Sequence, residues 1–219
     1  MTRDKIQVNI ETVLVGLIGV FVGVILNTFK DLYLRKRTEK IARTYLSIQI
    51  SALLHNFIYG CLDVVNDNGL YEGKRDESGC LRAQVDTPKF EPMSVEVDWT
   101  TLPPKLMQKL LQFPSDVEYS NIYISEVWEY AATPPNWDEF FEARIEKFAP
   151  LGVTAISLIK ELEAVSNVQL IDDKAISEIK KRLDLEIEKV EKAMRVRDAQ
   201  NAENLSKLST RESRNFGSI

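Results

Sequence analysis

The chain has 219 residues, a formal net charge of −5 and a charged fraction of 28%. This length suits one membrane anchor plus one modest domain, and the acidic balance provides no broad basic field for nucleic acid. We therefore expect no nucleic-acid partner. The two cysteines, Cys61 and Cys80, have eighteen residues between them, which is neither a zinc nor a redox spacing, so both are expected to be unpaired.

Residues 12–29, with the sequence TVLVGLIGVFVGVILNTF, form an uncharged run. As a helix it is about 27 Å long, close to the ~30 Å of a hydrocarbon core. A core helix of a soluble protein would carry a polar face, which this run lacks. A cleaved signal peptide would end in small residues, whereas the bulky and basic NTFKDLYLRKR follows here. The run is therefore predicted to be a single transmembrane helix.

Basic residues follow this run more often than they precede it. Only Arg3 and Lys5 lie before it, and the cluster after it contains Lys30, Arg35, Lys36, Arg37, Lys40 and Arg43. Because Lys and Arg favour the cytoplasmic side, residues 1–11 are predicted to form a short extracytoplasmic tail and the C-terminal part to lie in the cytoplasm. The cluster is also expected to contact anionic lipid heads, although topology alone explains it.

One face of the predicted span carries small and hydrogen-bonding residues. They are Thr12, Gly16, Gly19, Gly23 and Asn27, and Gly19 and Gly23 form a G-x-x-x-G pair. Small residues let two membrane helices approach closely, and an amide in lipid favours a partner. We expect self-association, or pairing with another membrane subunit, on this face. The alternative is that glycine is simply frequent in membrane helices and that Asn27 lies near the interface.

The first cytosolic helix is predicted to continue directly from the span through residues 30–68, because no proline precedes Pro88. The sequence NDNG should end it. One apolar stripe runs along it and a second set of apolar residues broadens the stripe, so this wide apolar surface is predicted to be buried on more than one side. The stripe contains Ile41, Tyr45, Ile48, Ala52, Phe57 and Cys61, and the second set contains Ile50, Leu53, Leu54, Ile58, Leu62 and Val65.

Residues 69–101 are predicted to be a long irregular loop, either functional or disordered. The alternation in MSVEVDW allows a small β element with Val95, Val97 and Trp99 facing inward.

A helical domain is predicted over residues 102–205. Its first helix should begin after a threonine cap with proline in the first turn and break at Pro114, with Ser115 capping the next helix. After the loop TPPNW, Asn136 is expected to cap a helix with Asp138 and Glu139 in its first turn. Pro150 should kink or divide that helix.

The last helix is predicted to span residues 172–204, with pairs Glu178–Arg182 and Glu188–Lys192 on its charged side. Packing onto a bundle is expected, with a coiled coil as the alternative. Its apolar stripe contains Ile176, Ile179, Leu183, Ile187, Val190 and Met194. Residues 206–219 are predicted to be a flexible tail. The fold class is therefore mainly α: one N-terminal transmembrane helix, then a bundle-like cytosolic domain with a long irregular loop.

The sequence contains no recognisable catalytic or metal-binding motif. His55 is the only histidine and is expected to be a packed core residue, as are the three tryptophans. Glu139, Glu142 and Glu146 share a helix face that should form salt bridges with Arg144 and Lys147. A second acidic group, Glu91, Glu96 and Asp98, follows no known catalytic spacing. We therefore expect no cofactor and no enzymatic activity.

The layout is similar to that of many small bacterial proteins with one N-terminal span and a helical cytosolic domain, a likeness of architecture without a shared motif. The first functional hypothesis is a non-enzymatic inner-membrane protein that docks or positions a cytosolic protein. The second is a membrane-perturbing effector or toxin-like component, as in bacterial defence systems. The third is an enzyme with an unrecognised site.

Overall fold

The computed structural model describes the backbone of residues 2–216 and the side chains of Leu17 and of residues 20–202. Over this range the chain contains α-helices and two short 3-10 helices, and no strand. In chain order they are α1 (Thr2–Asn66), η1 (Pro92–Ser94), η2 (Trp99–Thr101), α2 (Pro104–Tyr130), α3 (Asp138–Ser166) and α4 (Asp173–Phe216). The predicted mainly α fold class is confirmed.

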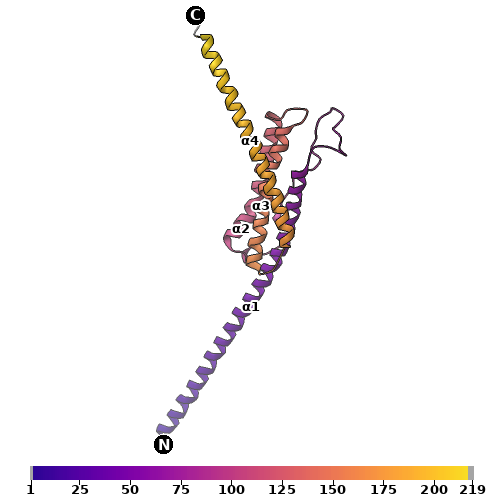
Figure 1. The fold of residues 1–219 in the computed structure, drawn as a ribbon. Helices are drawn as coiled ribbons and strands as arrows, with labels where there is room; N and C mark the ends of the chain where they lie inside the picture. Colours follow the sequence, from indigo (N-terminus) through magenta and orange to yellow (C-terminus); the bar gives the residue numbers. More distant parts are fainter. Residues whose placement is uncertain (1, 217–219) are drawn as a thin grey trace.

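The helices form an elongated body from which two helices project at opposite ends (Figure 1). The N-terminal part of α1 leaves the body at one end, and the C-terminal part of α4 leaves it at the other. Helix α3 is central, because it packs against α1, α2 and α4. The turn between α3 and α4 lies at the end from which α1 projects, and the α2–α3 loop lies at the opposite end.

Helix α1 confirms the predicted continuity between the apolar run and the first cytosolic helix. It runs without interruption to Asn66, where the predicted stop sequence begins. The Asn66 Nδ2 donates to the Leu62 carbonyl at 2.7 Å, which satisfies one carbonyl of the last turn.

The buried face of α1 differs from the prediction. Ile41, Tyr45 and Ile48 were expected to be buried but are 62%, 54% and 46% exposed, and Ala52 is exposed as well. The side that packs into the body includes Leu46, Ile50, Leu54, Phe57, Ile58, Cys61 and Leu62. Because α1 carries two apolar sides, its periodicity could not tell which of them meets α3. Phe57 and Cys61 are buried as predicted.

The predicted break at Pro114 is wrong, and so is a division of the helix at Pro150, whereas a kink at Pro150 stays a prediction. Pro114 lies inside α2 and Pro150 inside α3, and both helices continue through them. A proline removes one backbone hydrogen bond, but the neighbouring side chains hold each helix in place by packing. Phe113 is 1% exposed beside Pro114, and Phe148 is fully buried near Pro150. Ser115 consequently lies within α2 and caps nothing.

Two predicted helix starts shift by a few residues. Pro103 occupies the position before α2 with Pro104 in its first turn, so the expected proline is present but the threonine cap is not. Trp137, in the left-handed region at φ 56°, precedes α3 instead of Asn136. Asp138 and Glu139 occupy the first turn of α3 as predicted.

The segment between α1 and α2 is irregular, as predicted, with a single β-bridge between Tyr71 and Lys74. Residues 93–99 form no strand, yet Val95, Val97 and Trp99 are partly buried against the core, whereas the residues between them are exposed. The predicted inward alternation is therefore confirmed. The Asp98 side chain accepts the Thr100 backbone N–H at 3.0 Å and favours a 3-10 turn here over an extended strand.

Helix α4 packs on α3 through the predicted stripe, in which Ile176, Leu183 and Val190 are buried. The helix continues to Phe216, beyond the predicted end near residue 204. Among residues 173–202, the part of α4 with described side chains, the ion pairs within the helix are Lys180–Asp184, Glu186–Lys189 and Glu191–Arg195, and neither of the two predicted pairs is formed.

Candidate functional site

The projecting part of α1 exposes apolar side chains on every side. Residues 20–34 are all exposed, and Val20, Phe21 and Leu26 are each about two-thirds accessible at 68%, 67% and 63%. Only Lys30 and Asp31 are charged in this stretch. A helix that is apolar all round needs protein or lipid around it, and the structure places no other segment against it.

By length and composition, Val20–Asn66 of α1 qualifies as a candidate membrane span. Half of its most apolar window is buried inside the body, as in a core helix, so that window alone is weak evidence. Within the predicted association face, Gly23 and Asn27 lie on the exposed part of the helix. The side chains at Thr12, Gly16 and Gly19 lie outside the described residues.

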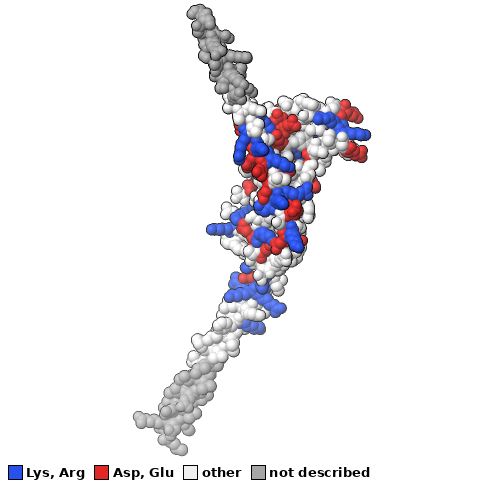
Figure 2. Space-filling model, in the orientation of Figure 1, with Lys and Arg blue, Asp and Glu red and all other residues white. Residues whose placement is uncertain are grey.

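A collar of basic side chains surrounds α1 where it enters the body (Figure 2). It is formed by Lys30, Arg35, Lys36, Arg37 and Lys40, which are all exposed. Arg35 pairs with Glu39 at 3.0 Å. Arg43 differs from the rest of the predicted group, because it is partly buried and its Nε donates to the Thr101 carbonyl at 2.7 Å. Arg43 therefore fixes α1 to η2.

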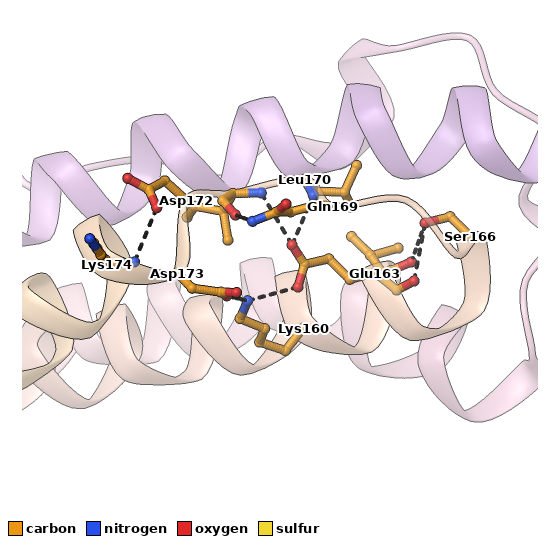
Figure 3. A network of polar contacts seen from close by, with 10 residues as sticks. Lys160, Glu163, Ser166, Gln169, Leu170, Asp172, Asp173 and Lys174 are labelled. Carbon is orange, nitrogen blue, oxygen red and sulfur yellow. Dashed lines mark hydrogen bonds and ion pairs between the residues drawn. The ribbon is translucent and has the colours of Figure 1, made fainter.

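The turn between α3 and α4, at the same end of the body, is held by one carboxylate (Figure 3). Glu163 Oε1 accepts the backbone N–H groups of Leu170 at 2.8 Å and Ile171 at 3.2 Å. Its other oxygen accepts from Lys160 Nζ at 2.8 Å, and Lys160 also pairs with Asp173 at the start of α4. Burial alone would raise the pKa of Glu163, but these hydrogen bonds lower it below its usual value. The network fixes where α4 begins.

A buried ion pair orders the long loop, and no pattern in the sequence predicts it. Arg144 Nη2 of α3 lies 3.3 Å from Asp67 Oδ2, and their side chains are 5% and 1% exposed. Arg144 also donates to the Val85 carbonyl at 2.7 Å, and Asp67 accepts from the backbone N–H of Gln84 at 2.9 Å. Burial lowers the pKa of Arg144, and the negative charges of Asp67 and Asp86 oppose that shift. No local signal links residues 77 positions apart.

The three glutamates predicted to share a helix face line a small cavity of about 150 Å³ with Tyr123 and Arg197. Glu142 pairs with Arg197, and Glu146 pairs with Lys147 at 2.7 Å. The predicted salt bridging is therefore confirmed for Glu146 and Lys147, whereas Glu142 pairs with Arg197 of α4 instead and Arg144 pairs with Asp67. Burial and the charge of Glu146 raise the pKa of the Tyr123 hydroxyl, which lies 3.3 Å from that carboxylate. Paired carboxylates of this kind act as structural anchors.

The remaining candidate residues are dispersed. Glu91, Glu96 and Asp98 are exposed on the irregular segment. His55 is partly buried rather than in the core, with its ring stacked on Tyr59 at 6.3 Å, and burial lowers its pKa. In the part of the chain whose side chains are described, no group of three or more His, Cys, Asp or Glu residues is placed to hold a metal ion.

An apolar groove of about 370 Å³ lies at the end of the body opposite the collar. The ring centroids of Trp128 and Trp137 lie 4.5 Å apart with the rings tilted by 38°, and Trp128 meets Phe140 edge-on at 4.9 Å. Trp128 is 46% exposed, so its predicted core position is wrong, whereas Trp99 packs on the core. The groove is lined by Leu81, Arg82, Ala83, Ile124, Ser125, Trp128 and Phe140. It joins three segments, the long loop, α2 and α3, which periodicity within one segment could not reveal.

No protein-family model matches the sequence, and comparisons with curated proteins and with solved structures also give no match.

Proposed function

We propose that this chain is a single-pass, membrane-anchored helical protein whose cytosolic body docks or positions another cytosolic protein. The observation that carries the proposal is the abrupt change along α1. Residues 20–34 are exposed on all sides, whereas from Leu46 onward one side of the same helix is fully buried in the body.

Two features support the membrane anchor: the apolar composition of the projecting part of α1 and the position of the basic collar directly after it. Apolar side chains surround the projecting helix, and the basic collar follows at the point where lipid head groups would lie. Phe29 and Tyr33, 68% exposed each, occupy the depth of interfacial aromatics. The basic excess on the body side favours an inner-membrane protein with its N-terminus outside and its body in the cytoplasm.

The docking role is supported by the groove at the far end of the body. Exposed aromatic and apolar side chains around a concave surface are typical of sites that bind an apolar segment of another protein. Glu142 and Glu146 are paired and Asp98 caps a turn, which favours a structural rather than a catalytic role for these three carboxylates.

The test is photo-cross-linking in living cells, with a photoreactive amino acid at Ser125 or Ala83 in the groove. The control position is Lys181, exposed on α4 away from the groove. We expect one adduct of defined mass at both groove positions and none at Lys181. Equal adducts at all three positions, or membrane depolarisation on expression as in an effector, would contradict the proposal.

A further inference from the structure

We propose that two copies of the chain pair in parallel along α1, through the exposed face formed by Ile41, Tyr45, Ile48, Ala52 and Tyr59. We name these five residues the α1 pairing face. The inference rests on the proposed anchoring, because a shared membrane sets both helices at the same height and in the same direction.

The pairing face is apolar and carries no charge. Ile41, Tyr45, Ile48 and Tyr59 are 46–62% exposed, which is unusual for apolar side chains that follow one another turn by turn. Between residues 41 and 62 the only Asp, Glu, Lys or Arg is Arg43. Its guanidinium is bound to the Thr101 carbonyl of η2 rather than lying on the face.

The body leaves this face free. The residues of α1 that contact the body, such as Leu46, Ile50 and Leu54, lie on the opposite side of the helix, about 140–180° away at 100° per residue. A second helix can therefore lie along α1 without displacing α2, α3 or α4.

The pairing face is in phase with the small residues of the predicted span. At 100° per residue, Gly23, Asn27 and Leu34 lie within about 40° of Ile41 around the helix. The stripe therefore continues from Gly23 to Tyr59 over about 54 Å of one uninterrupted helix. A Cβ built at Gly23 meets nothing within 4 Å, so this side is open to a close neighbour.

A second copy of the chain fits this stripe better than an unrelated protein. The partner must have an apolar helix that follows α1 both in the projecting segment and beside the body, and α1 itself has this form. In a two-fold parallel pair each residue meets its own copy, so any charge on the face would meet a like charge. The five residues of the α1 pairing face, between residues 41 and 59, carry no charge and therefore avoid this repulsion. Lys30 and Arg37 lie about 20° and 40° from Ile41 and therefore within the stripe, but they fall at the head-group level, where anionic phosphates offset their repulsion.

The experiment is disulfide cross-linking of the full chain in native membranes. A Cys80→Ser background retains Cys61, which is fully buried. Single cysteines are placed at Ile41 or Ile48 on the face and, as controls, at Lys36 or Glu39, which are exposed on the far side of α1. We expect dimers of twice the monomer mass at the face positions and roughly tenfold less at the controls, because a disulfide requires Cα atoms within ~7 Å.

A second variant separates pairing from folding. Ile48→Glu in the Ile41→Cys background should abolish the dimer while the chain keeps its helical circular-dichroism spectrum, because Ile48 is not in the core. Ile48→Leu should retain the dimer. Equal cross-linking at face and control positions in membrane-bound protein would overturn the pairing alone. An adduct of another mass at Ile41 would replace the second copy with a different protein. Release of the chain from the membrane would overturn the anchoring and the pairing together.

Discussion

Arg144 of α3 and Asp67, immediately after α1, form an ion pair of 3.3 Å that is almost completely shielded from water. The same two side chains bind the backbone of residues 84 and 85 and hold the long irregular segment against the body. One buried contact thus joins a helix end, a central helix and a loop.

Breaking this pair from one side should destabilise the body strongly. Asp67→Asn or Arg144→Met leaves the other charge buried without compensation, and we expect a loss of about 3–5 kcal/mol in the free energy of unfolding. Urea unfolding measures the effect. The matched control is Glu161→Gln, which breaks the exposed Lys109–Glu161 pair at 2.7 Å and should cost less than about 1 kcal/mol. Similar losses for both pairs would contradict the structural role of Arg144.

The two cysteines should differ sharply in reactivity. Cys61 is fully buried and burial raises the pKa of its thiol far above the usual range, whereas Cys80 lies partly exposed on the loop. A thiol reagent should therefore modify one cysteine in the native protein and two after denaturation. Modification of Cys80→Ser protein at the rate of the wild type would show that Cys61 is accessible after all.

The turn between α3 and α4 should weaken in acid. The pKa of Glu163 is lowered from about 4.5, so its contribution is complete above that value and is lost as pH falls through the lower native pKa. Glu163→Gln should cost about 1–2 kcal/mol near neutral pH and reduce the loss of stability below pH 4.5. Glu178→Gln, on the exposed side of α4, is the control and should change neither quantity. If the stability of Glu163→Gln fell with pH below 4.5 as steeply as that of the wild type, Glu163 would not be the origin of the acid sensitivity.

Patterns within one segment predicted whether that segment is helical and which residues alternate inward. They did not predict which other segments it packs against. The continuity of α1, the stripe of α4 and the inward alternation of Val95, Val97 and Trp99 follow from local periodicity, and the structure confirms them. The choice of buried side on α1 depends on α3, which the sequence of α1 cannot specify. Pro114 and Pro150 stay within helices because packing outweighs one lost hydrogen bond each.

The candidate sites also fall into two groups: those formed by neighbours in sequence, which could be predicted, and those formed by distant residues, which could not. The basic collar is a run of neighbours in sequence, so its members could be predicted. The predicted group also included Arg43, which instead binds the Thr101 carbonyl of η2. The Asp67–Arg144 pair and the apolar groove bring together residues tens of positions apart, and no pattern within one segment reveals such contacts.

The orientation in the membrane should depend on the collar. With the body in the cytoplasm, an impermeant maleimide should label Cys80 only after the membrane is permeabilised. Replacing Lys30, Arg35, Lys36 and Arg37 together by Gln should produce a mixed orientation, because these charges resist transfer across the bilayer. Four equivalent changes on the body, at Lys105, Lys109, Lys180 and Lys181, should have no effect. Labelling of the wild type in intact cells would reverse the predicted topology.

Alkaline carbonate extraction of membranes that contain the full chain tests the proposed anchoring most directly. We expect the wild type and the apolar control variant Val20→Ile/Val24→Ile to remain in the pellet. Val20→Arg/Val24→Arg should move to the supernatant, because two charges at the helix centre together oppose insertion by roughly 5–7 kcal/mol. Release of the wild type into the supernatant would contradict the anchor and the function proposed from it.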